Sequence, residues 1–447
     1  MTAPPSGGGD PGDPTAAPPG GPRLTGPDLT GPHVTGPLRH LRRYQLRKTS
    51  LRVVQSGHPW LFRGQLSSAA DVFRDGQWLA LIGPDNRPVA SGIFEAEGAI
   101  AVRVLERSPR APDAAWVDER VAAALARRAS SPLAGETDGF RAVHGESDGL
   151  PAVVVDVYAD TAVLSTYSSG ADALGRLVAA QVRRRLGLRR AVWKPAHRRR
   201  GQAGAALRAL AGELPAEPLR VREGALELRV DLAHGQKSGA YLDLRGLRRW
   251  ISGQDLTGRR VLNLFSYTGW LGLAAERAGA ALVASVDSSA AALEFAARHH
   301  AGPDGRQSFT VADVFEWLPA RAAQLARDPE RAGGERFDLV IADPPPMTSR
   351  MTQVERTLTA YRRLYGAAGR LVAPGGRVVA CCCTSRVGER DFVRAAASGL
   401  GPGFRFVRRL PPEVDHPVGF PEADYLKIAL FVREDDARQD RANLQAS

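Results

Sequence analysis

Short apolar runs alternate with Ala- and Leu-rich segments through the second half of the chain. The runs have the length of buried strands, and the segments between them have the length and composition of helices. We therefore predict strands at 261–265, at a run ending at Asp287, and at 309–312, 337–342, 376–382, 404–410 and 425–432, with helices after Gly269 and at 290–300, 314–326, 353–371 and 391–400.

This alternation is typical of an α/β fold with a doubly wound, mostly parallel, Rossmann-like sheet. The last two runs predict an antiparallel pair that closes the sheet. In such sheets ligands bind at the carboxyl ends of the strands. We expect one site at this edge, where Gly269, Asp287, Asp313, Asp343 and Cys383 fall.

The first half of the chain predicts two smaller units. The first is a small β-barrel, because its apolar runs are short and are separated by Gly, Pro, Asp and Asn. The second is an α+β domain without a glycine-rich turn, interpreted as a spacer or an RNA-contacting domain. The barrel runs are 77–82, 88–93 and 100–105, and the α+β domain has helices at 113–128 and 171–186, a hairpin of 153–157 with 162–166, and a strand at 191–194.

The N-terminal segment differs from the rest in composition. Residues 1–37 are dominated by Pro, Gly, Ala, Thr and Asp. Such a segment cannot bury enough apolar surface to offset its ordering entropy, so we interpret it as a disordered tail. The predicted division is a tail at 1–37, a barrel at 38–112, an α+β domain at 113–215 and the α/β domain at 216–447.

The chain is strongly basic, with 60 Lys and Arg against 48 Asp and Glu and a formal charge of +12 over 447 residues. This charge favours a polyanionic partner, since neutralising phosphates releases counterions. The basic stretch 39–52 precedes Trp60 and Phe62, which either stack on RNA or pack in the barrel core. The run 197–200 is a solvated face or a phosphate contact.

The three cysteines are consecutive, at 381–383. Their spacing excludes a disulfide framework and a spaced metal site, so no metal is expected. No apolar run approaches the roughly 20 residues of a membrane span, and the N-terminus lacks a signal pattern. We expect a cytoplasmic enzyme with no membrane partner, and a homodimer stays open.

The segment 259–287 predicts a nucleoside-binding β-α-β unit. A strand leads into Ser266-Tyr267-Thr268-Gly269, and the next strand ends at Asp287. Glycine lets a ligand approach backbone N–H groups, and a carboxylate about 20 residues on can accept both ribose hydroxyls. Only Gly269 and Gly272 remain of the Gly-x-Gly-x-x-Gly pattern of pyrophosphate sites. S-adenosylmethionine, which has a ribose and no phosphate, is therefore the expected cofactor.

The segment Asp343-Pro344-Pro345 ends one predicted strand, and Cys383 ends the next. Neither proline can donate a backbone hydrogen bond, so the loop is stiff and can hold the aspartate against an extruded base. Carbon 5 of a pyrimidine is a poor nucleophile, and addition of a thiolate at carbon 6 activates it. Cys383 is the candidate nucleophile, Asp343 is the group that stabilises the adduct, and Cys382 is the alternative nucleophile.

Several motifs carry a family resemblance. They are Gly-Gln-Lys-Ser-Gly-Ala-Tyr-Leu-Asp-Leu-Arg at 235–245, Val-Leu-Asn-Leu-Phe-Ser-Tyr-Thr-Gly at 261–269, Phe-Asp-Leu-Val-Ile-Ala-Asp-Pro-Pro at 337–345, Pro-Gly-Gly at 374–376, Asp-His-Pro-Val at 415–418 and Pro-Glu-Ala-Asp-Tyr-Leu-Lys at 421–427, with Ser-Gly-His-Pro-Trp at 56–60 and Gly-Glu-Ser-Asp-Gly-Leu-Pro at 145–151. Over about residues 44–433 the chain resembles the bacterial large-subunit rRNA cytosine-5 methyltransferases that carry an N-terminal PUA domain. Met347, where that family usually has an aromatic residue, and the triple cysteine depart from its pattern.

The resemblance implies a class I methyltransferase domain after a PUA-like barrel, S-adenosylmethionine as cofactor, 23S rRNA as partner and Cys383 as nucleophile. The segment 231–245 is interpreted as a loop that covers the ligand, because the Gly-Lys-Ser/Thr order of a phosphate loop is missing. The expected cofactor-binding residues are Lys237, Tyr241, Asp243, Arg245, Asn263, Phe265, Ser266, Tyr267, Thr268, Gly269, Asp287, Ser288, Asp313, Val314, Asp343 and Pro344.

Two other functions stay open. One is direct methyl transfer to a guanine ring nitrogen or an exocyclic amine, which needs Asp343 and no cysteine. The other is an RNA-binding ribosome assembly factor whose methyltransferase fold has lost activity.

Overall fold

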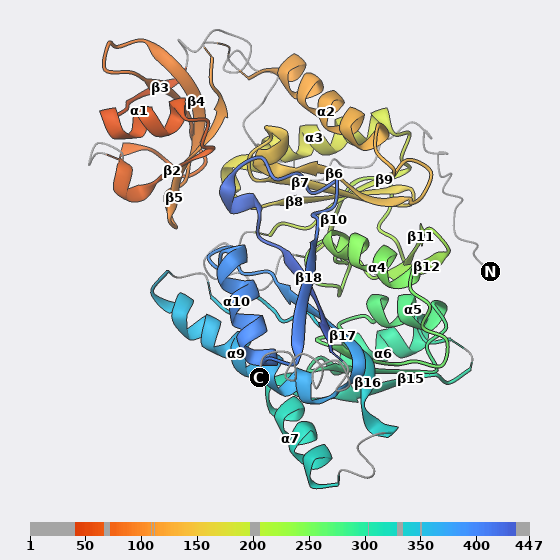
Figure 1. Ribbon diagram of the computed structural model, residues 1–447. Coiled ribbons are helices and arrows are strands. Elements are labelled where there is room, and N and C mark those ends of the chain that lie inside the picture. The colour runs from red at the N-terminus through yellow and green to blue at the C-terminus, as the bar shows by residue number, and fades with distance from the viewer. Residues whose placement is uncertain are drawn as a thin grey trace, which may run out of the picture.

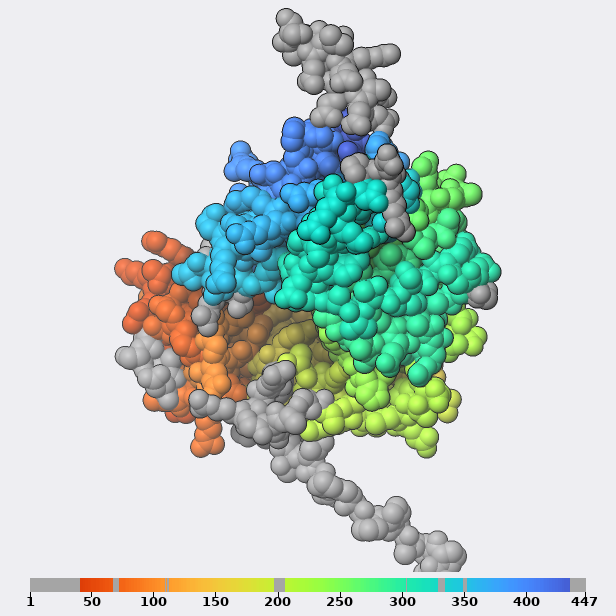
Figure 2. All heavy atoms as spheres, turned by 90° about the horizontal axis from the view of Figure 1, so that it is seen from below, coloured from red at the N-terminus to blue at the C-terminus, as the bar shows by residue number. Residues whose placement is uncertain are grey.

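The computed structural model describes residues 41–66, 72–108, 110, 112–196, 206–302, 304–328, 334–348 and 351–434. These residues form an N-terminal unit and a central unit on five-stranded sheets, a two-stranded hairpin, and a C-terminal unit on a seven-stranded sheet (Figure 1). Seen from below, the C-terminal unit in teal and blue lies beside the N-terminal unit in orange (Figure 2). The predicted tail at 1–37 and the basic run 197–200 lie outside the described residues.

The N-terminal sheet has the order β1-β3-β4-β5-β2. Strands β3, β4 and β5 are the three predicted runs and pair antiparallel, and β1 pairs parallel to β3. Leu61 is fully buried, whereas Trp60 and Phe62 on either side of it are half-buried, so neither aromatic ring belongs to the core of this unit. The elements are β1 Arg42–Gln45, α1 Lys48–Gln55, β2 Trp60–Phe62, β3 Trp78–Ile82, β4 Pro88–Phe94 and β5 Ile100–Glu106.

The central sheet has the order β10-β9-β8-β7-β6. The predicted hairpin, the two helices and the following strand are present, with a helix crossing over between the parallel strands β8 and β9. Strands β6 and β10 were not predicted, because their polar side chains break the apolar runs that mark a strand. The elements are α2 Ala114–Ala129, β6 Gly139–His144, β7 Val153–Tyr158, β8 Thr161–Thr166, α3 Asp172–Arg185, β9 Arg190–Trp193 and β10 Arg208–Ala211.

The C-terminal sheet has the order β15-β14-β13-β16-β17-β19-β18. The strands from β13 to β17 are parallel, and the last two strands are antiparallel as predicted. The strands are β13 Arg260–Leu264, β14 Leu282–Asp287, β15 Gln307–Val311, β16 Phe337–Ala342, β17 Val372–Cys382, β18 Phe404–Leu410 and β19 Lys427–Arg433.

Helices cover both faces of this sheet, as the doubly wound prediction requires. One face packs against α4 and α5, and the other against α7, α9 and α10. The chain runs outward from β13 in both directions, so the switch point of the topology lies between β13 and β16, where ligands bind in such sheets. The helices are α4 Arg245–Ser252, α5 Trp270–Arg277, α6 Ala290–His299, α7 Val314–Arg327, α9 Val354–Arg370 and α10 Glu389–Leu400.

Two segments connect the units. The hairpin of β11 Leu219–Glu223 and β12 Leu226–Val230 buries alternate side chains. The segment 411–426, between β18 and β19, reaches back to the central unit (Figure 1). There the buried Asp415 accepts the Arg141 backbone N–H at 2.9 Å and pairs with Arg245 at 3.0 Å. The three units therefore meet around the carboxyl end of the large sheet.

Candidate active site

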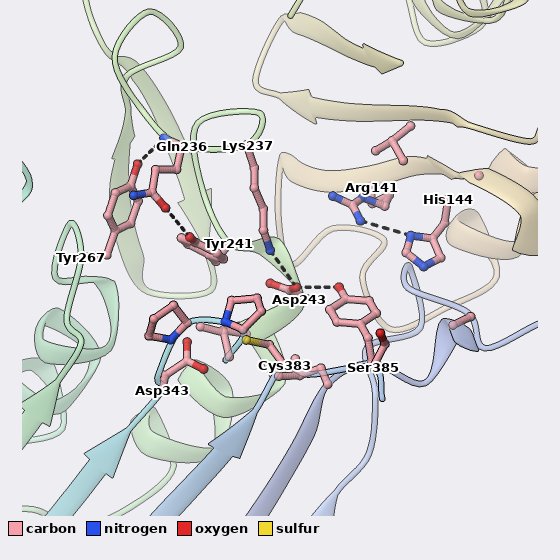
Figure 3. Close-up of a pocket in the computed structure, with 18 of the residues that line it drawn as sticks. Arg141, His144, Gln236, Lys237, Tyr241, Asp243, Tyr267, Asp343, Cys383 and Ser385 are labelled. Carbon is pink, nitrogen blue, oxygen red and sulfur yellow. Dashed lines mark hydrogen bonds and ion pairs between the residues drawn. The ribbon is translucent and has the colours of Figure 1, made fainter. Parts of the chain in front are cut away.

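A cavity of about 790 Å³ opens at the carboxyl end of the C-terminal sheet. All three units contribute to its wall: Trp60 and Arg103 come from the N-terminal unit, and Arg141 and His144 come from β6. The C-terminal unit contributes further wall residues, among them Asp343 and Cys383, which directly follow β16 and β17 (Figure 3). Sequence-distant residues are thus gathered at the predicted edge.

The loop after β13, which we call the donor loop (265–269), adopts a strained backbone. Phe265 and Tyr267 have positive φ angles of 59° and 48°, a conformation that L side chains rarely adopt outside functional sites. Asp287 holds the loop, because its two carboxylate oxygens accept the N–H groups of Tyr267 and Ser289, each at 2.8 Å. Asp287 also lines the cavity, where its remaining lone pairs are available to ribose hydroxyls.

The predicted covering loop, 231–245, is hydrogen-bonded to the donor loop. The Gln236 N–H donates to the Tyr267 hydroxyl oxygen at 2.6 Å, and the Tyr241 hydroxyl donates to the Gln236 side chain at 2.7 Å (Figure 3). The Lys237 ammonium lies 4.2 Å from the Tyr241 ring centroid and 3.5 Å from Asp243. This part of the cavity therefore has a polar and aromatic cover.

Asp243 is a buried carboxylate of the cavity wall. It accepts the Tyr425 hydroxyl at 2.6 Å. Burial alone would raise the pKa of Asp243, but Lys237, His416 and the Tyr425 hydrogen bond hold it well below its usual range. Asp243 is thus ionised at neutral pH.

The pKa of Asp343 depends on the negative charge of Asp243. Burial and the negative charge of Asp243 together raise the pKa of Asp343 to about 7. A carboxyl with this pKa can both accept and donate a proton near neutral pH, which is the requirement for general acid–base catalysis. The two carboxylates are therefore matched to different tasks.

The three cysteines occupy different environments. Cys381 and Cys382 are fully buried on opposite faces of the sheet, whereas Cys383 is partly exposed and lines the cavity. The Cys383 thiol donates to the Pro344 carbonyl oxygen at 3.2 Å, so the ends of β16 and β17 are in contact as the sequence predicts. Burial and the Asp343 carboxylate raise the pKa of Cys383 well above its usual range. The thiol thus keeps its proton until a base accepts it.

Most of the sequence-predicted residues lie in the cavity wall, but some lie elsewhere. Asn263 is fully buried, and Arg245 is buried in ion pairs with Glu223, Glu413 and Asp415. Gly269 caps α5 outside the wall, Asp313 caps α7 by accepting the Phe315 N–H at 2.7 Å, and Val314 is buried. The residues in the wall are Lys237, Tyr241, Asp243, Phe265, Ser266, Tyr267, Thr268, Asp287, Ser288, Asp343, Pro344 and Cys383.

Several wall residues were not predicted as site residues. Arg141 and His144 lie within four residues before the motif at 145–151, Phe420 directly precedes the motif at 421–427, and Tyr425 falls within it. The nearby motifs were the available signal, but nothing in the sequence indicated that these residues face the same cavity.

Two negative findings complete the description of the site. In the described ranges, no group of three or more His, Cys, Asp and Glu residues is placed to hold a metal ion. Within the same ranges, no helix is both long and apolar enough to cross a bilayer.

Comparisons with known proteins identify the family of the chain. A family model described as S-adenosylmethionine-dependent methyltransferase matches residues 176–432, and a PUA-like domain model matches residues 45–107. A ribosomal RNA large subunit methyltransferase from Deinococcus radiodurans is 35% identical over 399 residues, covering 86% of this chain and 95% of the relative. The chain belongs to the S-adenosylmethionine-dependent rRNA large subunit methyltransferase family.

Further relatives agree with this assignment. A ribosomal RNA large subunit methyltransferase I from Shewanella amazonensis is 32% identical over 382 residues, covering 83% of this chain and 94% of the relative. Two solved structures share the fold of this methyltransferase at 19% identity, covering 88% of this chain and 100% of theirs. One is a putative methyltransferase complexed with SAH, with a TM-score of 0.73, and the other is a putative SAM-dependent methyltransferase from Streptococcus mutans, with a TM-score of 0.72.

The wall of this methyltransferase fits S-adenosylmethionine, its cofactor. Ser266 Oγ and Trp270 Nε1 are buried without a hydrogen-bond partner among the described residues. Ser266 belongs to the donor loop, Trp270 directly follows it, and both line the cavity. Buried polar atoms are rarely left unpaired, so they match the polar groups of a ligand. Asp287 would hold the ribose, and the donor loop would place backbone N–H groups around the adenosine.

His300 is expected to position the donor loop of this methyltransferase. Its Nε2 accepts the Arg229 N–H at 2.9 Å, so its Nδ1 carries the proton and donates to the Thr268 carbonyl oxygen at 2.6 Å. Burial lowers the pKa of His300 to about 4, which keeps the ring neutral at pH 7. His300→Phe leaves two half-buried backbone groups without this partner, and we expect the Kd for S-adenosylmethionine, measured by calorimetry, to rise about 10-fold or more.

His299→Phe is the matched control, because this neighbouring ring contacts Phe295 rather than the donor loop. An unchanged Kd in His300→Phe would show that the loop keeps its shape without the histidine.

Proposed function

We propose that this protein forms 5-methylcytosine in 23S rRNA, with Cys383 as nucleophile and Asp343 as its proton partner. The observation that carries the proposal is the meeting of a partly exposed thiol, a carboxyl with a pKa of about 7 and the donor loop in one cavity. S-adenosylmethionine supplies the electrophilic methyl group when it is bound. The protein must then make carbon 5 of the cytosine nucleophilic.

Asp343 and Cys383 act as a pair that shares one proton. Ionised Asp343 takes the thiol proton, which the Pro344 carbonyl oxygen cannot accept, and the thiolate adds to carbon 6 of the ring. The protonated Asp343 then donates a hydrogen bond to ring nitrogen 3, where negative charge develops. After methylation a base removes the proton from carbon 5, the carbon–sulfur bond breaks, and the thiolate is released.

Three observations support RNA as the substrate. The relatives are named ribosomal RNA large subunit methyltransferases. The N-terminal unit matches a PUA-like domain, and the chain carries a formal charge of +12. We propose that 38–112 is a PUA-like RNA-binding domain, 113–215 a central domain and 216–447 the methyltransferase domain.

One observation favours a second function, direct transfer to a guanine ring nitrogen or an exocyclic amine. The raised pKa of Cys383 keeps the thiol protonated, and a protonated thiol is a poor nucleophile. Direct transfer would use Asp343 alone as the base. An inactive assembly factor would instead fail to bind S-adenosylmethionine in a titration.

The test of the proposed function is a nucleoside analysis of rRNA. Large-subunit rRNA from a deletion strain, incubated with the purified protein and S-adenosylmethionine, should gain 5-methylcytidine at one mapped position. A methylated guanosine, or a methylated amine in place of 5-methylcytidine, would favour direct transfer.

A further inference from the structure

One end of β6 and the turn that follows it form a part of the cavity that the proposed mechanism does not use. The turn is the 3₁₀ helix η4 Gly145–Asp148, which begins the motif at 145–151. Arg141 and His144 from β6 face the cavity across from the donor loop, and Cys383 lies between the two sides (Figure 3). The proposed mechanism leaves this side of the cavity for the nucleotide that is methylated.

Arg141 is a buried cation with unused donors. Its Nε and Nη2 donate to the two carboxylate oxygens of Asp156 at 2.8 and 3.1 Å, and its Nη1 donates to His144 Nδ1 at 3.1 Å. The Arg141 side chain is 11% exposed and Asp156 is fully buried. A guanidinium carries five N–H groups. The three hydrogen bonds found within the described residues use three of them, which leaves two N–H groups for a ligand.

His144 offers a third donor. Because its Nδ1 accepts from Arg141, a neutral ring carries its proton on Nε2. Burial and the positive charge of Arg141 hold the pKa of His144 well below its usual range, so the ring is neutral at pH 7. The two side chains therefore present N–H groups to the cavity and no acceptor.

The turn fixes this pair in place. Asp148 is buried, pairs with Arg128 at 2.7 Å and accepts the His144 N–H at 2.6 Å. Glu146 accepts the Trp60 Nε1–H at 2.8 Å and pairs with Arg103, which ties the turn to the N-terminal unit. Donors mounted on a rigid strand and turn lose little entropy when they bind a ligand.

We propose that Arg141 and His144 form a donor pair that binds an acceptor oxygen of the target nucleotide, either pyrimidine O2 or the adjacent phosphate. The inference rests on the proposed function and adds the substrate contact that it lacks. Both oxygens accept hydrogen bonds only, which matches two side chains that offer donors only. The position of the pair, across Cys383 from the donor loop, assigns it to the RNA and not to the cofactor.

The test compares Arg141→Lys and His144→Phe with the wild type, using an RNA fragment that contains the mapped site. We expect kcat/KM for the RNA to fall about 10- to 100-fold in each variant, the range for losing a hydrogen bond from a charged or buried donor. The Kd for S-adenosylmethionine should stay unchanged. His144→Gln should recover part of the loss, because its amide can donate in place of Nε2.

The matched control is Arg190→Lys. Arg190 lies in the same unit, also pairs with an aspartate, Asp160, at 2.8 and 2.9 Å, and lies outside the cavity wall. It should leave kcat/KM unchanged. Wild-type kcat/KM in both site variants would overturn the proposal, as would a parallel loss of S-adenosylmethionine affinity. His144→Phe keeps the test valid if Arg141→Lys does not fold.

Modified RNAs distinguish whether the pair binds pyrimidine O2 or the phosphate. If the pair binds the phosphate, a methylphosphonate 5′ to the target slows the wild type but not Arg141→Lys. If the pair binds pyrimidine O2, replacing the target with 2-thiocytidine slows the wild type but not Arg141→Lys. If neither modified RNA changes the ratio of kcat/KM between the wild type and Arg141→Lys, the pair does not bind the nucleotide. Methylation of a different base would contradict the proposed function but leave the comparison of the two variants with the wild type intact. Normal 5-methylcytidine formation in both variants would contradict the donor pair alone.

Discussion

Cys383→Ala abolishes methyl transfer to RNA while the protein still binds S-adenosylmethionine. Removing a covalent nucleophile costs on the order of 10³-fold or more in kcat, because carbon 5 then has no activated form to attack the methyl group. The donor loop and Asp287 do not depend on the thiol, so the Kd for the cofactor should match that of the wild type. Methyl transfer is measured with labelled cofactor on the RNA fragment.

Cys382→Ala provides the matched control for the thiol. Cys382 is fully buried in the cluster with Tyr361 and Phe392 and does not line the cavity. Its replacement should lower the free energy of unfolding by about 1 kcal/mol through lost packing and leave kcat unchanged. If Cys383→Ala retains near-normal activity, transfer is direct. If only Cys382→Ala is inactive, the nucleophile is the preceding cysteine.

Asp343→Asn lowers kcat about 10²- to 10⁴-fold, the usual contribution of a general acid–base. Asparagine can still donate a hydrogen bond to the ring, but it cannot accept the thiol proton. In the wild type, Asp343 is protonated well below pH 7 and cannot take that proton, so kcat/KM for RNA should rise with pH through about 7. The variant should lose this limb of the pH profile.

The Tm of Asp343→Asn distinguishes a loss of proton transfer from a loss of folding. The folded-state pKa of Asp343 is raised, so the folded protein binds this proton more tightly than the unfolded chain, and ionisation destabilises the fold as the pH rises toward 7. Asp343→Asn removes that cost, and its Tm at pH 8 should not fall. Asp338→Asn, on the same strand but paired with Arg259, is the control. An unchanged pH profile in Asp343→Asn would assign the proton transfer to another group.

The sequence was sufficient to predict the doubly wound sheet and the meeting of Asp343 with Cys383. Both residues follow strongly apolar runs, and parallel strands bring their carboxyl ends to one edge. The placement of β19 between β17 and β18 was not predicted, because strand order depends on contacts far apart in the chain. The hairpin of β11 and β12 was missed because its alternating polar residues interrupt the apolar pattern.

Side-chain direction limited the prediction of the site. Asn263 and Arg245 stand in the same motifs as wall residues, yet Asn263 is fully buried outside the wall and Arg245 pairs with buried carboxylates. Arg141 and His144 reach the cavity only because the central unit packs against the C-terminal sheet. A local pattern places a residue on an element, whereas docking between units determines which cavity the side chain enters.

The most direct measurement is intact mass spectrometry of the protein with S-adenosylmethionine and an RNA fragment whose target cytidine carries fluorine at carbon 5. Fluorine cannot leave as a proton does, so the carbon–sulfur bond should persist. The predicted product is one protein linked to one methylated RNA, with the link at Cys383 after digestion. Formation of 5-methylcytidine from normal RNA without any linked product from the fluorinated RNA would contradict the covalent mechanism.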